Sequence, residues 1–149
     1  MSDIQDVIKT RELQLVDSEG RPRIHLGLGD SDNATMQFLD RNEKVRVKVG
    51  CEAKGPASIS LCDSDGEARI VAMVAENGSS YLFMYDKQGV TRVQVETGSA
   101  DITTVILGGK NKKPLVKATV DSPADSYELG NVSLYDSNGK LLLKMPQSF

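Results

Sequence analysis

The sequence predicts an all-β protein of six antiparallel hairpins, on the evidence of a repeat, an alternation and a recurrent turn. The repeat has a period of 23 residues. Its anchors are Asp17, Asp40, Asp63, Asp86, Gly109 and, four residues later than the period requires, Asp136. Apolar and polar side chains alternate on both sides of each anchor, which is the two-residue period of a β-strand. We therefore expect one repetitive domain over residues 1–149, with about twelve strands.

Four columns of apolar residues support the repeat. They lie four and two residues before each anchor, and seven and nine residues after it. Their members are Leu13, Met36, Ile59, Leu82, Val105 and Val132; Leu15, Phe38, Leu61, Met84, Leu107 and Leu134; Ile24, Val47, Ile70, Val93, Val116 and Leu143; Leu26, Val49, Ala72, Val95, Ala118 and Met145. All twenty-four are apolar, although apolar residues make up only 39% of the chain. We expect these columns to face an inner core.

An Asp-x-x-Gly turn is expected to join the two strands of each unit. Asp at the first position favours a type I turn, and Gly at the fourth supplies a left-handed conformation. Residues that pair across a hairpin lie on the same face of the sheet, so the loop must have an even number of residues. We expect a four-residue loop, in which the residue two before the anchor pairs with the residue five after it. Asp40 is followed by Glu43, and Gly109 by Lys112, so these two turns should be less ideal.

Two architectures accommodate six hairpins of this length. A β-trefoil uses alternate hairpins in two different roles, so its sequence should repeat more strongly every 46 residues than every 23. Adjacent units resemble each other instead, which favours a meander or solenoid-like sheet, or a closed β structure, in which every unit has the same role. The β-trefoil remains the alternative.

A column of arginines follows the anchors by six residues. It comprises Arg23, Arg46, Arg69 and Arg92, and continues as Leu115 and Leu142. The predicted register places the four arginines opposite Gln14, Gln37, Ser60 and Phe83. Such a row is either a docking strip for an acidic partner or a solvated face whose arginines pair with nearby acids. We favour the second explanation.

From the third unit onward the second face of the hairpins also becomes apolar, at Val71, Met73, Phe83 and Tyr85. Strands that are apolar on both sides are typical of burial on both faces. Either the sheet folds over itself there, or a second copy of the protein covers it. With the four arginines, these residues form the candidate interaction surface.

Composition argues against several classes of partner and location. The net charge of −3 gives no electrostatic basis for binding nucleic acid or an anionic membrane. There is no apolar run of 18 residues and no secretory signal pattern at the start of the sequence. Cys51 and Cys62 are too few for a disulfide framework. We expect a cytoplasmic protein with reduced thiols.

No catalytic, metal or cofactor site is predicted. His25 is the only histidine and falls in a surface column of a strand, so neither a hydrolytic triad nor a zinc site has its residues. The Asp-rich turns are too short for a calcium loop, and turn formation already explains them. The glycine-bearing segments lack phosphate-loop spacing. We expect a protein that is not an enzyme and needs no cofactor.

The segments LQLVDSEGRPRIHLGL, ISLCDSDGEARIVAMV and LFMYDKQGVTRVQVET resemble the tandem LxLxDxxGxxRxxLxL repeats of uncharacterised bacterial proteins. The resemblance covers nearly the whole chain, from about Ile8 to Met145. It implies a hairpin architecture and transfers no site residues.

The functional hypothesis is a non-enzymatic structural or protein-interaction module that assembles as a homo-oligomer, with a further protein partner left open. The alternative is a carbohydrate or small-ligand binding module of β-trefoil type. Its candidate aromatic residues are Tyr81, Tyr85, Tyr127 and Tyr135.

Overall fold

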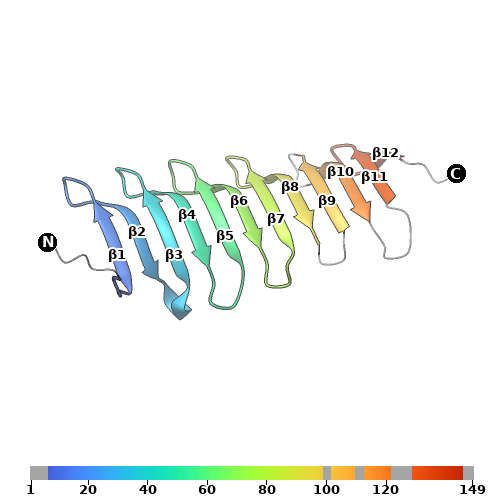
Figure 1. Ribbon diagram of the computed structural model, residues 1–149. Coiled ribbons are helices and arrows are strands. Elements are labelled where there is room, and N and C mark those ends of the chain that lie inside the picture. Colours follow the sequence, from blue (N-terminus) through green and yellow to red (C-terminus); the bar gives the residue numbers. More distant parts are fainter. Residues whose placement is uncertain (1–6, 99–101, 110–112, 122–128, 146–149) are drawn as a thin grey trace.

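The computed structural model describes residues 7–98, 102–109, 113–121 and 129–145, in which twelve β-strands form one open antiparallel sheet (Figure 1). The strands are β1 (Glu12–Val16), β2 (Pro22–Leu28), β3 (Ala34–Leu39), β4 (Val45–Cys51), β5 (Ala57–Cys62), β6 (Ala68–Val74), β7 (Ser80–Tyr85), β8 (Thr91–Thr97), β9 (Ile102–Gly108), β10 (Pro114–Asp121), β11 (Leu129–Tyr135) and β12 (Leu141–Met145). A short 3-10 turn, η1 (Asp30–Asp32), lies between β2 and β3.

The strands follow one another in sequence order across the sheet, so the predicted meander is confirmed. The β-trefoil and the closed structure are wrong, because β1 and β12 lie at opposite ends of the sheet and do not pair. Because strands that follow each other in the sequence are also neighbours in the sheet, no strand crosses over to cover one of its faces. A meander of equal units therefore stays in one layer.

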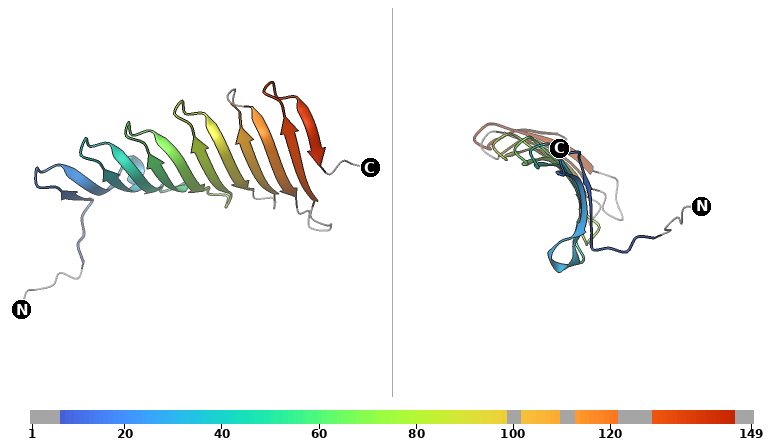
Figure 2. Two further views of the ribbon diagram at one scale, coloured as in Figure 1. Left: turned by 90° about the horizontal axis from the view of Figure 1, so that it is seen from above. Right: turned by 90° about the vertical axis from the view of Figure 1, so that its left-hand side faces the viewer.

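The sheet is a single curved layer, as Figure 2 shows in its view along the sheet from the β1 end. No hydrophobic side chain in the described part of the chain is fully buried. The accessible surface is 10957 Å², whereas a compact monomer of this mass would expose about 7,500 Å². The expectation that the apolar columns face an inner core is wrong for the single chain, and so is closure of the sheet over itself.

The four apolar columns form two unbroken rows on one face, which we call the apolar face. The first row is Leu15, Ile24, Phe38, Val47, Leu61, Ile70, Met84, Val93, Leu107, Val116, Leu134 and Leu143. The second is Leu13, Leu26, Met36, Val49, Ile59, Ala72, Leu82, Val95, Val105, Ala118, Val132 and Met145. Each residue is the direct cross-strand partner of its neighbours in the row. The residues between them form the opposite face, called the polar face below.

The predicted pairing register within the hairpins is wrong by two residues. Leu15, two before the anchor, pairs with Ile24, which is seven after it rather than five. Two β-bulges cause the difference. Gly20 is an extra residue in the turn, since Asp17 pairs with Arg21, and Arg23 is an extra residue opposite Val16. Each bulge shifts the pairing by one residue. The two shifts add up to two residues, the period of a strand, so the apolar columns stay on one face of the sheet.

The second bulge recurs at the same position in all six hairpins, at Arg23, Arg46, Arg69, Arg92, Leu115 and Leu142. The arginine column is therefore a bulge column. Its members do not lie opposite the predicted partners: Gln14 pairs with His25, Gln37 with Lys48, Ser60 with Val71 and Phe83 with Gln94.

The anchor turns all lie along one edge of the sheet, called the turn edge below (Figure 1). In the first turn, the amide of Gly20 donates to the carbonyl of Asp17 at 3.0 Å, and Gly20 has φ 77°. Glu43 holds the equivalent position at φ 58°, which is unfavourable for a residue with a side chain. The prediction of a less ideal second turn is confirmed. The centre of the fifth turn lies outside the described residues.

Candidate interaction surfaces

The first row of the apolar face is corrugated. Its members on odd-numbered strands are 36–52% exposed, whereas its members on even-numbered strands are all more covered. The odd strands carry Leu, Phe and Met in this row, and the even strands carry Ile and Val except for Leu143. Long side chains that are unbranched at Cβ thus form ridges, and mostly β-branched side chains form the grooves between them. The ridges recur every two strands, about 10 Å apart.

A third row extends the apolar face toward the edge opposite the turns. It comprises Leu28, Ala34, Cys51, Ala57, Val74, Ser80, Thr97, Thr103, Val120 and Gly130. No member of the three rows is charged. An uncharged surface of this length on a chain with 26% charged residues is a strong indication of an interface.

An open groove of about 1000 Å³ lies on the N-terminal half of this face. Its floor includes Leu26, Met36, Val49, Ile59 and Ala72 from the second row. The walls are mostly apolar, and the groove is open along its length rather than enclosed. Its shape suits an inserted row of apolar side chains better than a small molecule surrounded on all sides.

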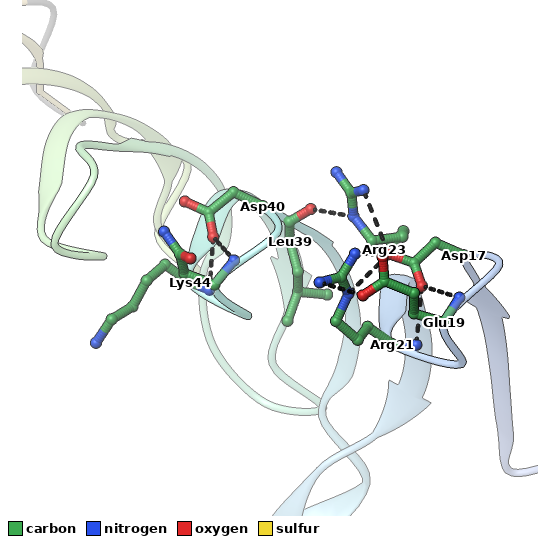
Figure 3. A network of polar contacts seen from close by, with 8 residues as sticks. Asp17, Glu19, Arg21, Arg23, Leu39, Asp40 and Lys44 are labelled. Atoms are coloured by element: carbon green, nitrogen blue, oxygen red, sulfur yellow. Dashed lines mark hydrogen bonds and ion pairs between the residues drawn. The ribbon is translucent and has the colours of Figure 1, made fainter.

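The arginines of the bulge column connect neighbouring hairpins along the turn edge. Arg23 donates from Nε to the carbonyl of Leu39 in the next hairpin at 3.0 Å (Figure 3). Its guanidinium also lies 3.8 Å from Oδ2 of Asp17 in its own turn. Arg46 repeats this arrangement, with the carbonyl of Cys62 at 3.1 Å. Because a β-bulge changes the direction of its side chain, the arginine can reach both hairpins.

Two further arginines bind their turn aspartates more closely. Arg69 donates from Nε to Oδ2 of Asp63 at 2.7 Å, and its other nitrogens reach Asp63 and the carbonyl of Asp86. Arg92 donates to Oδ2 of Asp86 at 2.7 Å. The four arginines do recur along one edge, but each is partly occupied by bonds within the sheet. The structure thus shows the intramolecular pairing that we favoured for this column.

The turn aspartates accept several hydrogen bonds each, and this determines their pKa values. The side-chain bond from Arg69 is the main cause of the lowered pKa of Asp63. The amide of Val90 has the same effect on the pKa of Asp86. Partial burial acts to raise the pKa of Asp17, but hydrogen bonds from Arg21 and Glu19 outweigh it and hold it below its ordinary value. These carboxylates are structural anions of the turn.

In the part of the chain that the structure describes, the polar face carries an apolar cluster on β6 and β7. Val71 pairs with Phe83, and Met73 pairs with Tyr81. The ring of Phe83 is stacked between Tyr81, with ring centroids 5.7 Å apart, and Tyr85 at 6.1 Å. The structure thus brings the predicted residues Val71, Met73, Phe83 and Tyr85 together. All of them are half-buried by their neighbours.

Arg69 borders this cluster. A shallow depression of about 480 Å³ is lined by Arg69, Val71, Tyr85 and residues of the neighbouring turns. The other three arginines do not line this depression. The predicted interaction surface is therefore not one continuous patch, and the larger unpartnered surface is the apolar face.

The only histidine of the sequence is paired with a neighbouring acidic residue. His25 lies on the polar face with Nε2 at 3.3 Å from a carboxylate oxygen of Glu12. No group of three or more metal-ligating side chains occurs among the residues that the structure describes. In the same residues no helix is long and apolar enough to cross a membrane. Cys51 and Cys62 are both free.

The corrugation of the apolar face was not predicted from the sequence, although its signal is present in the residue types. Leu, Phe and Met fill the column two before the anchor in all six units, and Ile or Val fill the column seven after it in five of six. Once the two columns are known to pair, this difference predicts alternating heights along the row.

No protein-family model matches this chain, and no curated protein is significantly similar to it.

Proposed function

We propose that this protein is a non-enzymatic structural or protein-interaction module that self-assembles through its apolar face. The observation that carries the proposal is the pair of unbroken apolar rows, which cross all twelve strands and are covered by no other element of the described chain. Exposed apolar surface of this extent is unfavourable in water, at about 25 cal/mol for each Å². Covering it by association removes that cost.

The regularity of the units supports a structural role. The bulge and the apolar columns recur in all six hairpins, and the Asp-x-x-Gly turn recurs in four of them. The polar groups on the turn edge are largely engaged in bonds that hold the hairpins together. A scaffold that presents one repeated surface is the simplest use of such an arrangement.

The test is the oligomeric state of the intact chain in dilute solution. Sedimentation velocity between 1 and 100 µM, on the order of ordinary dimer affinities, should show a concentration-dependent shift from the 16.2 kDa chain to a larger species, or a larger species throughout. A single species of the monomer mass over the whole range would refute self-assembly.

The carbohydrate-binding alternative receives less support. The β-trefoil on which it depended is not formed. Of its candidate residues, Tyr81 and Tyr85 stack on Phe83 and cover both faces of that ring. Tyr135 lies at the end of β11, and Tyr127 lies outside the described residues. A glycan array without binding above background would remove this alternative.

A further inference from the structure

We propose that the partner of the apolar face is a second copy of this chain, packed face to face in a two-fold symmetric sandwich whose axis runs along the strands between β6 and β7. This inference rests on the proposed self-assembly and specifies its geometry.

The corrugation makes the face complementary to itself. Ridges on odd strands and grooves on even strands alternate along the first row. Two such surfaces interlock when an odd strand of one copy lies over an even strand of the other. Interdigitation of this kind is how the inner faces of β-sandwiches form a core, with the sheets about 10 Å apart.

The number of strands produces this match without an offset. A two-fold axis along the strands, midway through a sheet of 12 strands, places strand k over strand 13 − k. An odd strand is then always over an even one. At the centre, Met84 faces Ile70 of the second copy and Leu61 faces Val93. A rotation about this axis does not move residues along the strand direction, so the first row of one copy lies over the first row of the other. The ridges of that row therefore meet its grooves.

The area is sufficient for a stable dimer. Twelve strands at about 4.8 Å give a length of about 58 Å, and two rows have a width of about 14 Å. Each copy would thus bury about 800 Å², which is the standard size of a specific protein interface. Sheets of a sandwich align within about 30°, so the central strands β5–β8 should make the closest contacts.

Charge does not oppose this arrangement. The three rows of the apolar face contain no charged residue, although the chain carries a net charge of −3. The turn aspartates and the bulge arginines lie at the turn edge. Arg11, which lines the groove near Leu28, is paired with Asp32 at the opposite edge. A copy of the chain is therefore an acceptable partner for this face despite its like net charge.

Distance measurements between paramagnetic labels test the geometry. The native thiols would first be removed as Cys51→Ser and Cys62→Ser. A single label is then placed at Ser18 in the first turn or at Arg41 in the second. From the strand spacing, the proposed axis predicts separations of about 50 Å for the first label and about 30 Å for the second. Equal separations would overturn the proposal, because head-to-tail joining of β12 to β1, or an axis along the sheet, moves both turns alike. A shorter separation for the first label than for the second, as from pairing of two β1 edges, would also overturn it. So would two separations far above about 50 Å, as from pairing of two β12 edges.

Charge substitutions identify the face involved. Leu61→Glu places a charge at the centre of the apolar face and should weaken dimerisation at least 100-fold. The matched variant Phe83→Glu, on the polar face, should change it by less than about 3-fold. The reverse order would show that the aromatic cluster is the interface. If Leu61→Glu prevents folding, the label distances in the unsubstituted face still decide the geometry.

These outcomes separate the two proposals. A monomer at all concentrations refutes self-assembly and the sandwich together. A stable oligomer with equal label distances, or with greater sensitivity to Phe83→Glu, refutes the sandwich alone.

Discussion

Arg69 donates a hydrogen bond from Nε to Oδ2 of Asp63 at 2.7 Å and thereby ties the β-bulge of the third hairpin to its turn. A second nitrogen of the same guanidinium donates to the carbonyl of Asp86 in the fourth hairpin. One side chain thus joins two units at the turn edge. Neither hairpin has a covered core of its own in the described chain, so contacts between units must contribute to their order.

Replacing this arginine should loosen the junction between the third and fourth hairpins. Lysine in Arg69→Lys carries one ammonium group and cannot occupy both sites as a planar guanidinium does. We expect the thermal midpoint, followed by circular dichroism, to fall by a few degrees. Arg11→Lys is the control, because Arg11 is 82% exposed and its described ion pair, with Asp32, lies at the surface. Equal changes in the two variants would contradict the bridging role.

Acid should destabilise the sheet through its turn aspartates. The pKa values of Asp17, Asp40, Asp63 and Asp86 are all lowered in the folded protein. A lowered folded pKa stabilises the fold fully above the unfolded value of about 3.9, and this stabilisation is lost as the pH falls through the folded values. We expect the free energy of unfolding in urea to decrease steeply below about pH 4.

The variant Asp63→Asn provides the control for the acid effect. An amide does not titrate, so the variant should be less stable at pH 7 but should lose less stability between pH 4 and pH 2.5. An unchanged pH dependence in Asp63→Asn would show that other groups are responsible.

The architecture was predictable because the repeat specifies it redundantly. Twenty-four apolar positions and five anchor aspartates point to the same alternation and the same turn. The pairing register could not be predicted in the same way, because an even or odd spacing shows only whether two columns share a face of the sheet. Pairing Leu15 with residue 22 or with Ile24 satisfies parity equally. The choice depends on the bulge at Arg23, which adds a residue without altering the polar and apolar pattern.

The absence of a core in the described chain could not be predicted from the apolar columns either. Apolar residues every second position show that one face is removed from water, but they do not show what covers it. The same columns would fit a closed barrel, a sandwich within one chain or a sandwich between two. Leu61 and its neighbours remain exposed in the single chain because each strand of the meander pairs with the next one and none is placed over the apolar face.

The second turn should be open to stabilisation at Glu43. Its backbone has φ 58°, where a side chain costs about 1–2 kcal/mol. Glu43→Gly relieves this strain but increases the freedom of the unfolded chain, so we expect a net gain of about 0.5–1 kcal/mol in urea unfolding. The converse variant Gly66→Ala has no steric obstacle, since its nearest neighbour lies 3.9 Å away, and should lose about 1 kcal/mol. Changes of the same sign in both would contradict the strain argument.

The two native cysteines should report on which face is covered. Cys51 lies in the third row of the apolar face and is exposed in the single chain, whereas Cys62 is partly buried at the end of β5. Burial raises the pKa of the Cys62 thiol, so less thiolate is present at a given pH and its reaction with a maleimide should be slower than that of a free thiol.

Assembly should affect the two thiols differently. In Cys62→Ser, the remaining Cys51 should react faster as the protein is diluted, because dissociation uncovers the apolar face. In Cys51→Ser, the rate at Cys62 should not depend on protein concentration. Stopped-flow labelling at matched concentrations measures both rates. If the rate at Cys51 stays constant while the fraction of oligomer falls, the interface does not reach the third row, and the contact would be limited to the two rows that contain Leu61 and Ile59.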